Sequence, residues 1–178
     1  MSGVLEAIRG EYPNGTLTTA TTWNGAAFVA GLVNLKRPYR VVEVGANVGV
    51  TSAFLANAIR DNGTGLLLAY ELDLANCLEA RNRLAALWPE GSWEVVEGDF
   101  FEMVTPDPVD FAFIDIDPKE DYTKAYEALT FAPGAVIVAH DIDLYPAEII
   151  PFAERLKADG WNTLTLPWER GFLVAVKS

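Results

Sequence analysis

The chain has 178 residues, of which 51% are hydrophobic and 21% are charged, and this composition suits one globular domain with a core of ordinary size. The formal net charge of -12 repels phosphate backbones and anionic lipid surfaces, so nucleic acid and membrane partners are not expected. With a single cysteine, Cys77, the chain has no internal disulfide framework and no zinc site of the multi-cysteine kind.

The beginning of the sequence shows no secretion or membrane signal. The segment MSGVLEAIRG lacks a positively charged stretch followed by a long apolar one, and no stretch reaches the ~18 apolar residues of a membrane span. We therefore expect a cytoplasmic protein. Residues 1–178 are expected to form one domain, with an N-terminal helical segment at 1–38 and a binding and catalytic core at 39–178.

Short apolar runs rich in Val, Ile, Leu and Phe alternate with longer amphipathic segments, which is typical of α/β proteins. Strands are predicted at 40–44, 65–70, 93–98, 109–115, 134–140, 162–166 and 172–177, and helices at 24–34, 50–60, 74–87, 120–130 and 146–159. The first five strands are separated by crossovers long enough for parallel pairing, whereas only PWERG separates the last two. The sequence therefore predicts a doubly wound, Rossmann-like sheet of seven strands, mostly parallel, with a C-terminal antiparallel hairpin.

The first predicted strand runs into a glycine-containing loop, VVEVGANVGV. Gly45 and Gly49 allow the backbone to approach a ligand closely, while Asn47 tolerates a left-handed conformation and can bond locally to the turn. The helix that begins near Val50 offers free N–H groups to an anionic end of the ligand. The spacing differs from the Gly-x-Gly-x-x-Gly fingerprint of dinucleotides, and Glu43 would repel a pyrophosphate, so a cofactor with a positive ammonium is favoured.

Acidic residues also follow the second and third predicted strands. Glu71 ends the second strand about 22 residues beyond Gly49, where an acid can accept both hydrogen bonds of a ribose diol. Asp73 lies nearer the next helix and suits its N-terminal cap. Asp99 ends the third strand and is followed by Phe100. The position of Glu71 therefore predicts a contact with a nucleoside.

Together these features resemble the class I S-adenosylmethionine (SAM)-dependent methyltransferases. The run from Glu43 to Gly49 is similar to their acidic-x-Gly-x-Gly-x-Gly motif, with Asn47 in place of the middle glycine. The resemblance implies that Glu43 faces the ammonium region of the cofactor, directly or through water. It also implies that Asp99 contacts the adenine amino group and that Phe100 lies against the ring. The implied cofactor-binding residues are Glu43, Gly45, Asn47, Gly49, Thr51, Glu71, Asp99, Phe100 and Asp115.

A second segment, VDFAFIDIDPKEDYTKAYEAL, resembles IDADK..Y..Y...L of the metal-dependent O-methyltransferases related to caffeoyl-CoA and catechol O-methyltransferase. Asp115 falls on the first metal ligand of that family, and the strand PGAVIVAHDID places His140 and Asp141 where the family has Asp-Asn. One inserted residue shifts Lys119 relative to the basic lysine of the family. The resemblance implies that Asp115, His140 and Asp141 are metal ligands and that Lys119 and Asp115 are catalytic.

The loops after the fourth and fifth predicted strands also concentrate negative charge. Two carboxylates about 4 Å apart repel by roughly 4 kcal/mol at an effective dielectric of 20, so a cation, a shared proton or Lys119 must offset them unless they point into water. Oxygen ligands favour Mg, Ca or Mn over Zn. The six acids concerned are Asp115, Asp117, Glu120, Asp121, Asp141 and Asp143.

The expected activity is SAM-dependent O-methylation of a small hydroxylated molecule, a catechol-like phenol or a sugar or natural-product hydroxyl, assisted by a divalent cation. Lys119 can act as the base only if the cation and burial lower its pKa. The alternatives are a metal-independent methyltransferase with Asp115 or His140 as the base, a catalytically silent SAM-binding module, and a nicotinamide oxidoreductase. A homodimer, in which a partner chain completes the pocket, also stays open. Four aromatic residues either line the pocket or pack in the core: Trp23, Tyr122, Tyr145 and Trp168.

Overall fold

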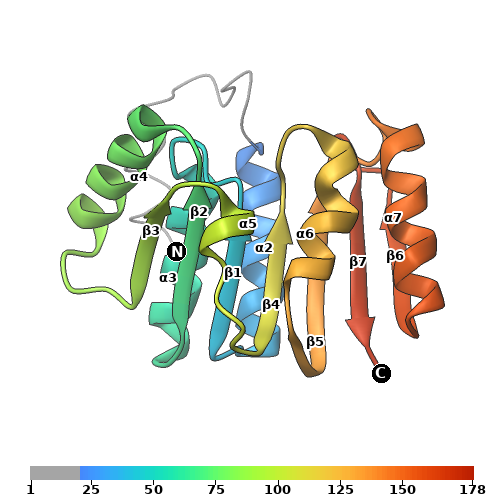
Figure 1. Cartoon of the computed structure of the whole chain (residues 1–178). Helices are drawn as coiled ribbons and strands as arrows, with labels where there is room; N and C mark the ends of the chain where they lie inside the picture. The colour runs from blue at the N-terminus through green and yellow to red at the C-terminus, as the bar shows by residue number, and fades with distance from the viewer. Residues whose placement is uncertain (1–20) are drawn as a thin grey trace.

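The computed structural model of the chain describes residues 21–178, in which one seven-stranded sheet lies between helices (Figure 1). The predicted α/β class and the number of strands are confirmed, whereas the predicted N-terminal segment lies outside the described residues up to residue 20. The strands are β1 (Arg40–Val44), β2 (Leu66–Glu71), β3 (Trp93–Glu97), β4 (Val109–Ile114), β5 (Phe131–His140), β6 (Trp161–Leu166) and β7 (Phe172–Lys177). The helices are α2 (Trp23–Lys36), α3 (Val50–Asn62), α4 (Leu74–Leu87), α5 (Phe100–Met103), the 3-10 turn η1 (Lys119–Asp121), α6 (Tyr122–Ala128) and α7 (Pro146–Ala158).

The strand order is β3-β2-β1-β4-β5-β7-β6. The first five strands pair in parallel, and β7 pairs antiparallel with both β5 and β6, which confirms the predicted hairpin. Because the order reverses between β1 and β4, the loops that leave these two strands diverge. That divergence opens a crevice at the carboxyl ends of the strands, where ligands bind in sheets of this kind.

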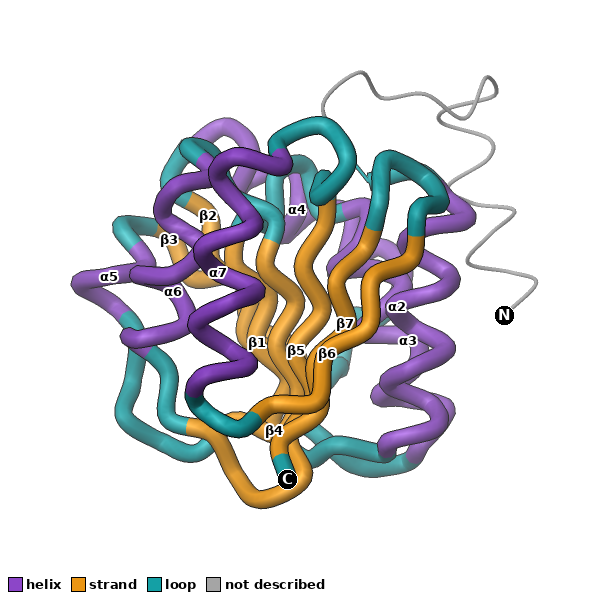
Figure 2. Tube along the Cα trace, turned by 90° about the vertical axis from the view of Figure 1, so that its right-hand side faces the viewer, coloured by secondary structure: helices purple, strands orange, loops and turns teal. Residues whose placement is uncertain are grey.

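Helices cover both faces of the sheet, as Figure 2 shows, with α2 and α3 on one side and α5, α6 and α7 on the other. Successive strand residues point to opposite faces, so Val41 packs in the cluster with α2 and α3, while Val42 packs in the cluster with α6 and α7. Burial on both faces explains why the strands appear in the sequence as continuous apolar runs. Cys77 is fully buried in the first cluster, as expected for a packing residue.

The differences from the predicted elements are local. The four-residue helix α5 was not predicted, because one turn leaves too little sequence for a helical period. The helix predicted at 120–130 is divided between η1 and α6. Strand β5 begins at Phe131, three positions earlier than predicted, because Phe131 still pairs with Val109 beyond an irregularity in the ladder. Asp73 caps α4 as predicted by accepting a hydrogen bond from the amide of Asn76.

None of the helices within residues 21–178 combines the length and the apolar character that crossing a bilayer requires.

Candidate active site

A cavity of about 790 Å³ opens at the carboxyl ends of the central strands. One end is formed by the loops after β1, β2 and β3, and the other by the loops after β4 and β5 and by the turn between β6 and β7. The predicted site residues in its wall are Gly45, Asn47, Thr51, Glu71, Asp99, Phe100, Asp115, Lys119 and Asp141. Glu43, Gly49 and His140 lie behind this wall.

Glu43 is fully buried and does not line the cavity. Its Oε2 accepts a hydrogen bond of 2.5 Å from the hydroxyl of Ser52, while its Oε1 has no hydrogen-bond partner. Burial raises the pKa of Glu43 to about 8, so the carboxyl is largely protonated near neutral pH. Glu43 therefore does not reach the cavity directly in this conformation, and its predicted contact with a cofactor ammonium through water stays a prediction.

The loop after β1 is organised by Asn47 and Glu71. Asn47 adopts a left-handed conformation with φ of 50°, and its Oδ1 accepts from the amide of Val48 at 2.8 Å, which confirms the role predicted from its chemistry. The amide of Asn47 donates to Oε2 of Glu71 at 2.7 Å, and Oε1 of Glu71 accepts from the amide of Asp73 at 2.9 Å. Glu71 thus joins the loops after β1 and β2 at the cavity wall.

The two loop glycines lie against neighbouring segments of the same chain. At Gly45, where φ is 92°, a Cβ would overlap the carbonyl oxygen of Asp115. At Gly49, where φ is 81°, a Cβ would lie 2.7 Å from the Cα of Ala80 in α4. The bare backbone therefore makes room for neighbouring segments of the same chain. Gly45 also lines the cavity, and the close approach of a cofactor to this backbone stays a prediction.

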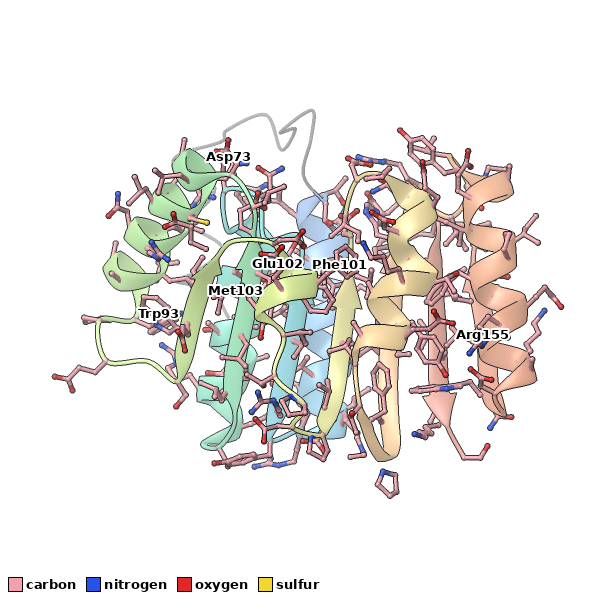
Figure 3. The ribbon with its side chains drawn as sticks, viewed as in Figure 1. Asp73, Trp93, Phe101, Glu102, Met103 and Arg155 are labelled. Atoms are coloured by element: carbon pink, nitrogen blue, oxygen red, sulfur yellow. The ribbon has the colours of Figure 1, made fainter. Side chains whose placement is uncertain are left out.

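The end of the cavity formed by the loops after β1, β2 and β3 is partly aromatic. The ring of Phe100 is almost fully buried and stands edge-on to that of Tyr70, with ring centroids 5.1 Å apart. Phe101 lies on the side of α5 that faces α6, where the ammonium of Lys124 sits 3.6 Å from its ring centroid (Figure 3). Asp99 caps α5 by accepting from the amide of Phe101 at 2.9 Å and also lines the cavity. This end offers a flat apolar surface beside an acid.

At the other end of the cavity, β4 and β5 bring Asp115 and Asp141 together, as the predicted adjacency of these strands requires. The ammonium of Lys119 lies 3.0 Å from Oδ1 of Asp115 and 3.2 Å from Oδ2 of Asp141. A second cation, the guanidinium of Arg170, bonds Oδ2 of Asp141 at 2.5 Å. The chain itself therefore supplies cations that offset the predicted repulsion between the two carboxylates.

The pKa shifts within this cluster follow from its charges. Burial alone would raise the pKa of Asp115, but the hydrogen bond with His140 and the charge of Lys119 outweigh it and hold that pKa well below its usual range. Burial alone would lower the pKa of Lys119, but the neighbouring carboxylates, Asp115 foremost, outweigh it and raise that pKa. Lys119 therefore keeps its proton within this cluster, and the lowered pKa that its predicted role as a base requires would have to come from a bound cation.

His140 is completely buried at the centre of the cluster. Its Nε2 lies 2.9 Å from the carbonyl oxygen of Glu169, and since a carbonyl only accepts, Nε2 carries a hydrogen. Its Nδ1 lies 3.1 Å from Oδ2 of Asp115 and 3.3 Å from Oδ1 of Asp141. Burial alone would lower the pKa of His140, but the hydrogen bond and charge of Asp115 outweigh it and raise that pKa.

The predicted metal ligands can be tested on the same geometry. The ligand atoms of Asp115, His140 and Asp141 lie within 4.8 Å of one another, and Oδ1 of Asp141 is buried without a hydrogen-bond partner. The donor set therefore suits a divalent cation. Lys119 lies between the two carboxylates, however, so a cation would have to displace its ammonium. Asp117, which is exposed, reaches only Lys119, at 3.4 Å.

Three residues that bond the cluster of Asp115, His140 and Asp141 were not predicted: Thr21, Glu169 and Arg170. Thr21 lines the cavity and donates to Oδ2 of Asp115 at 2.9 Å. Glu169 and Arg170 lie in the PWERG turn. The sequence shows that a turn occurs there, but it does not show which part of the chain the turn faces. A chemical signal was present, since Arg170 is a cation within a turn next to the strand that carries His140.

Of the four aromatic residues considered as pocket walls, Tyr145 alone lines the cavity. Tyr122 is a core residue whose hydroxyl donates to the carbonyl oxygen of His140 at 3.2 Å. Trp168 packs edge-on against Phe28, with ring centroids 5.9 Å apart. Of the two alternatives left open for these four residues, packing therefore holds for most of them.

The fold and the site define an enzyme of the methyltransferase class. The family model described as a methyltransferase domain matches residues 42–142, which is more than half of the chain, and the chain belongs to this family. The comparison with curated proteins finds no match.

Solved structures agree with this fold. The chain is similar to the O-methyltransferase TomG from Streptomyces achromogenes, involved in tomaymycin synthesis and solved with SAM, with 20% identity over 100% of this chain and 90% of that chain and a TM-score of 0.78. An O-methyltransferase from Bacillus cereus, solved with SAH, gives 21% identity over 100% and 91% and a TM-score of 0.78. An SAH-bound methyltransferase from Podospora anserina gives 13% identity over 99% and 87% and a TM-score of 0.83.

Proposed function

We propose that the protein transfers a methyl group from SAM to a hydroxyl oxygen of a small molecule. The observation that carries this proposal is the shared cavity, which joins the loop after β1 and Glu71 at one end to Asp115, Lys119 and Asp141 at the other. A nucleoside cofactor and a hydroxylated acceptor can thus meet in one space. The structural similarity to TomG and to the Bacillus cereus O-methyltransferase supports the choice of SAM as donor and oxygen as acceptor.

The cofactor end has the groups that a nucleoside needs. Glu71 lines the cavity, where its carboxylate can accept hydrogen bonds from a ribose diol. Asp99 and Phe100 offer an acceptor and an apolar ring for the base. The start of α3, with Thr51 in the wall, presents amide donors to a carboxylate. The remaining proposed contacts are Gly45, Asn47 and Asp115, with Glu43 and Gly49 acting from behind the wall.

The acceptor end is built to position and stabilise an oxygen. Bound SAM supplies a methyl group activated by its positive sulfur. The acceptor oxygen must lie in line with the methyl–sulfur bond, which breaks as the bond between the methyl group and the oxygen forms. The ionised carboxylate of Asp115 faces the cavity and can accept the hydrogen of the substrate hydroxyl, which aims the oxygen. Lys119 and Arg170 are fixed cations that stabilise negative charge developing on that oxygen.

A divalent cation at Asp115, His140 and Asp141 is a second form of this proposal, favoured by the clustered ligand atoms and by Oδ1 of Asp141, which is buried without a hydrogen bond. Mg, Ca or Mn there would lower the pKa of the bound hydroxyl. The metal-independent form is favoured by Lys119, whose ammonium already lies between the carboxylates. In that form Asp115 is the proposed proton acceptor.

Two measurements test the proposal. SAM or SAH at about 100 times its dissociation constant should raise the free energy of unfolding by roughly 2.7 kcal/mol, whereas NADH should not. Turnover on catechols and hydroxylated natural products, with Mg and with excess chelator, should yield O-methylated products and should separate the two forms. Stabilisation by NADH alone would indicate an oxidoreductase, and tight SAM binding without turnover would indicate a silent binding module.

We also propose that residues 1–178 act as one domain with the core at 39–178, and that the substrate is a catechol-like phenol or a sugar or natural-product hydroxyl. The cavity, open between loops and without an inserted lid domain among residues 21–178, suits such a molecule. Cytoplasmic localisation, the homodimer and the absence of nucleic acid partners stay predictions.

A further inference from the structure

We infer that Glu169 is a positioning residue that fixes the orientation of the His140 ring from the opposite side of the active site. The inference deepens the proposed function, on which its kinetic test rests, while its spectroscopic test needs no substrate. Glu169 does not line the cavity, so any effect it has on the reaction passes through other residues.

The backbone of the β6–β7 turn directs the carbonyl group of Glu169 at His140. Glu169, Arg170 and Gly171 are three consecutive residues with positive φ, at 53°, 70° and 88°. The turn is attached to the segment after β5, because the amide of Asp143 donates to the carbonyl oxygen of Arg170 at 3.0 Å. In this conformation the carbonyl oxygen of Glu169 lies 2.9 Å from Nε2 of His140.

The side chain of Glu169 anchors the same turn to the start of α2. Its Oε2 accepts from the hydroxyl of Thr22 at 2.5 Å, and its Oε1 accepts from the side-chain Nδ2 of Asn24 at 3.3 Å. Thr22 is itself fixed, because its Oγ1 caps α2 by accepting from the amide of Gly25 at 3.1 Å. The carboxylate is therefore held by a segment that is already anchored.

These contacts close a ring of hydrogen bonds around the catalytic cluster. Thr21, the neighbour of Thr22, donates to Asp115 at 2.9 Å, and Asp115 lies 3.1 Å from Nδ1 of His140. His140 bonds the carbonyl of Glu169, and the carboxylate of Glu169 returns to Thr22. The ring joins the start of α2, the ends of β4 and β5, and the β6–β7 turn.

This ring of hydrogen bonds determines which nitrogen of the His140 imidazole faces the acids. A hydrogen bond from Nε2 to a carbonyl oxygen fixes the rotation of the imidazole and leaves Nδ1 directed at Asp115 and Asp141. A positive φ is unfavourable for a glutamate, so its backbone stays there only while other contacts hold it. Without the carboxylate anchor the turn relaxes, the carbonyl moves away from Nε2, and the His140 ring is free to rotate.

The imidazole of His140 can be observed directly, because His140 is the only histidine in the chain. Nitrogen-15 NMR of an untagged protein should show a single imidazole, with its Nε2 proton protected from exchange. Glu169→Ala and Thr22→Val should both remove that protection. Glu169→Gln should keep it, since its amide oxygen can still accept from Thr22. The matched control is Glu90→Ala, which removes an exposed glutamate from the turn before β3.

Kinetics supply the second readout. Glu169→Ala and Thr22→Val should lower kcat by roughly 10- to 100-fold, the usual effect of losing a group that orients a catalytic or ligating histidine, with the KM for SAM unchanged. Glu169→Gln should restore most of kcat. An unchanged imidazole signal in folded Glu169→Ala would overturn the inference, as would a fall in kcat that Glu169→Gln shares in full. If no acceptor is turned over, the proposed function fails, and the NMR comparison still decides the role of Glu169.

Discussion

Gly45, the first residue after β1, lies so close to Asp115, the first residue after β4, that no side chain fits between them. A Cβ on Gly45 would overlap the carbonyl oxygen of Asp115, and the amide of Asp115 donates to the carbonyl oxygen of Val44 at 3.0 Å. The glycine loop therefore fixes the backbone of Asp115. The proposed cofactor and acceptor ends of the cavity share this one backbone contact.

We predict that Gly45→Ala destabilises the fold as well as weakening the cofactor site. The substitution combines an unfavourable positive φ with an overlap against backbone that cannot move aside, and such overpacking costs about 1–3 kcal/mol. Urea unfolding measures the loss. Gly63→Ala is the matched control, because Gly63 also has a positive φ, of 73°, but no atom within 4 Å of the added Cβ. Equal losses in both variants would show that the contact with Asp115 is unimportant.

Glu43 should make the protein less stable as pH rises through neutrality. Its pKa is raised by burial from 4.5 to about 8 in the folded state, so between these values the unfolded chain loses a proton that the folded chain keeps. The free energy of unfolding should fall by about 1.4 kcal/mol per pH unit over this window and level off above it. Below pH 4.5 both states are protonated and the contribution disappears.

Glu43→Gln should abolish this slope and be more stable than the wild type at pH 8, while keeping an acceptor for Ser52. Urea unfolding from pH 4.5 to 9 provides the comparison. Glu94→Gln, at an exposed position in β3, should follow the wild-type curve. A slope that persists in Glu43→Gln would mean that another group takes up the proton.

Removing Lys119 should strengthen divalent cation binding at the acceptor end. Its ammonium lies 3.0 Å and 3.2 Å from the oxygens of Asp115 and Asp141, where a metal ion would compete with it. Unit charges about 4 Å apart interact by roughly 4 kcal/mol at a dielectric of 20, and about 1.4 kcal/mol already gives a factor of ten. Lys119→Met should therefore raise the affinity for Mg or Mn at least about tenfold.

Titration calorimetry tests this prediction, with Lys124→Met as the control that removes a cavity-lining lysine away from the two acids. Asp115→Asn and Asp141→Asn, each introduced into the Lys119→Met background, should reduce the gained affinity. Unchanged binding in Lys119→Met would show that the cluster is a protein ion pair and not a metal site.

Glu71→Ala should weaken SAM binding more strongly than the loss of a single ligand contact would. The carboxylate accepts from the amides of Asn47 and Asp73, so its removal also loosens the loop that follows β1. Each neutral hydrogen bond contributes about 1 kcal/mol and bonds to charged groups more, so a loss of affinity of about 100-fold is expected. Glu97→Ala, which removes an exposed acid paired with Arg81, is the control in the same calorimetric assay. Equal affinities in the two variants would contradict the ribose role.

The sheet was predictable because its strands are covered on both faces. Continuous apolar runs mark such strands whatever their neighbours, and the short PWERG connection leaves a hairpin as the natural geometry. Asn47 was predictable for a similar reason, since its left-handed backbone follows from its own chemistry. Features that depend on one residue and its immediate neighbours were thus within reach of the sequence.

The active-site contacts were less predictable because they depend on side-chain direction and distant partners. The acid at the end of β1 was identified, but whether Glu43 faces a ligand or Ser52 is decided by packing. Lys119 was identified as well, yet its charge state follows from the distances to Asp115 and Asp141. Thr21 and Glu169 gave no local signal, since each gains its role only through residues far along the chain.

The ring that holds His140 also has a consequence for the order of events during synthesis. Thr22 and Glu169 are separated by 147 positions, and Thr21 and Asp115 by 94. A ribosome therefore releases the acids and Lys119 well before the turn that completes their surroundings, and long-range closures of this kind form slowly. Until that turn emerges, Asp141 has no Arg170 and His140 has no carbonyl partner. The surroundings proposed for methyl transfer are thus complete only once the β6–β7 turn has been synthesised and has folded beside β5.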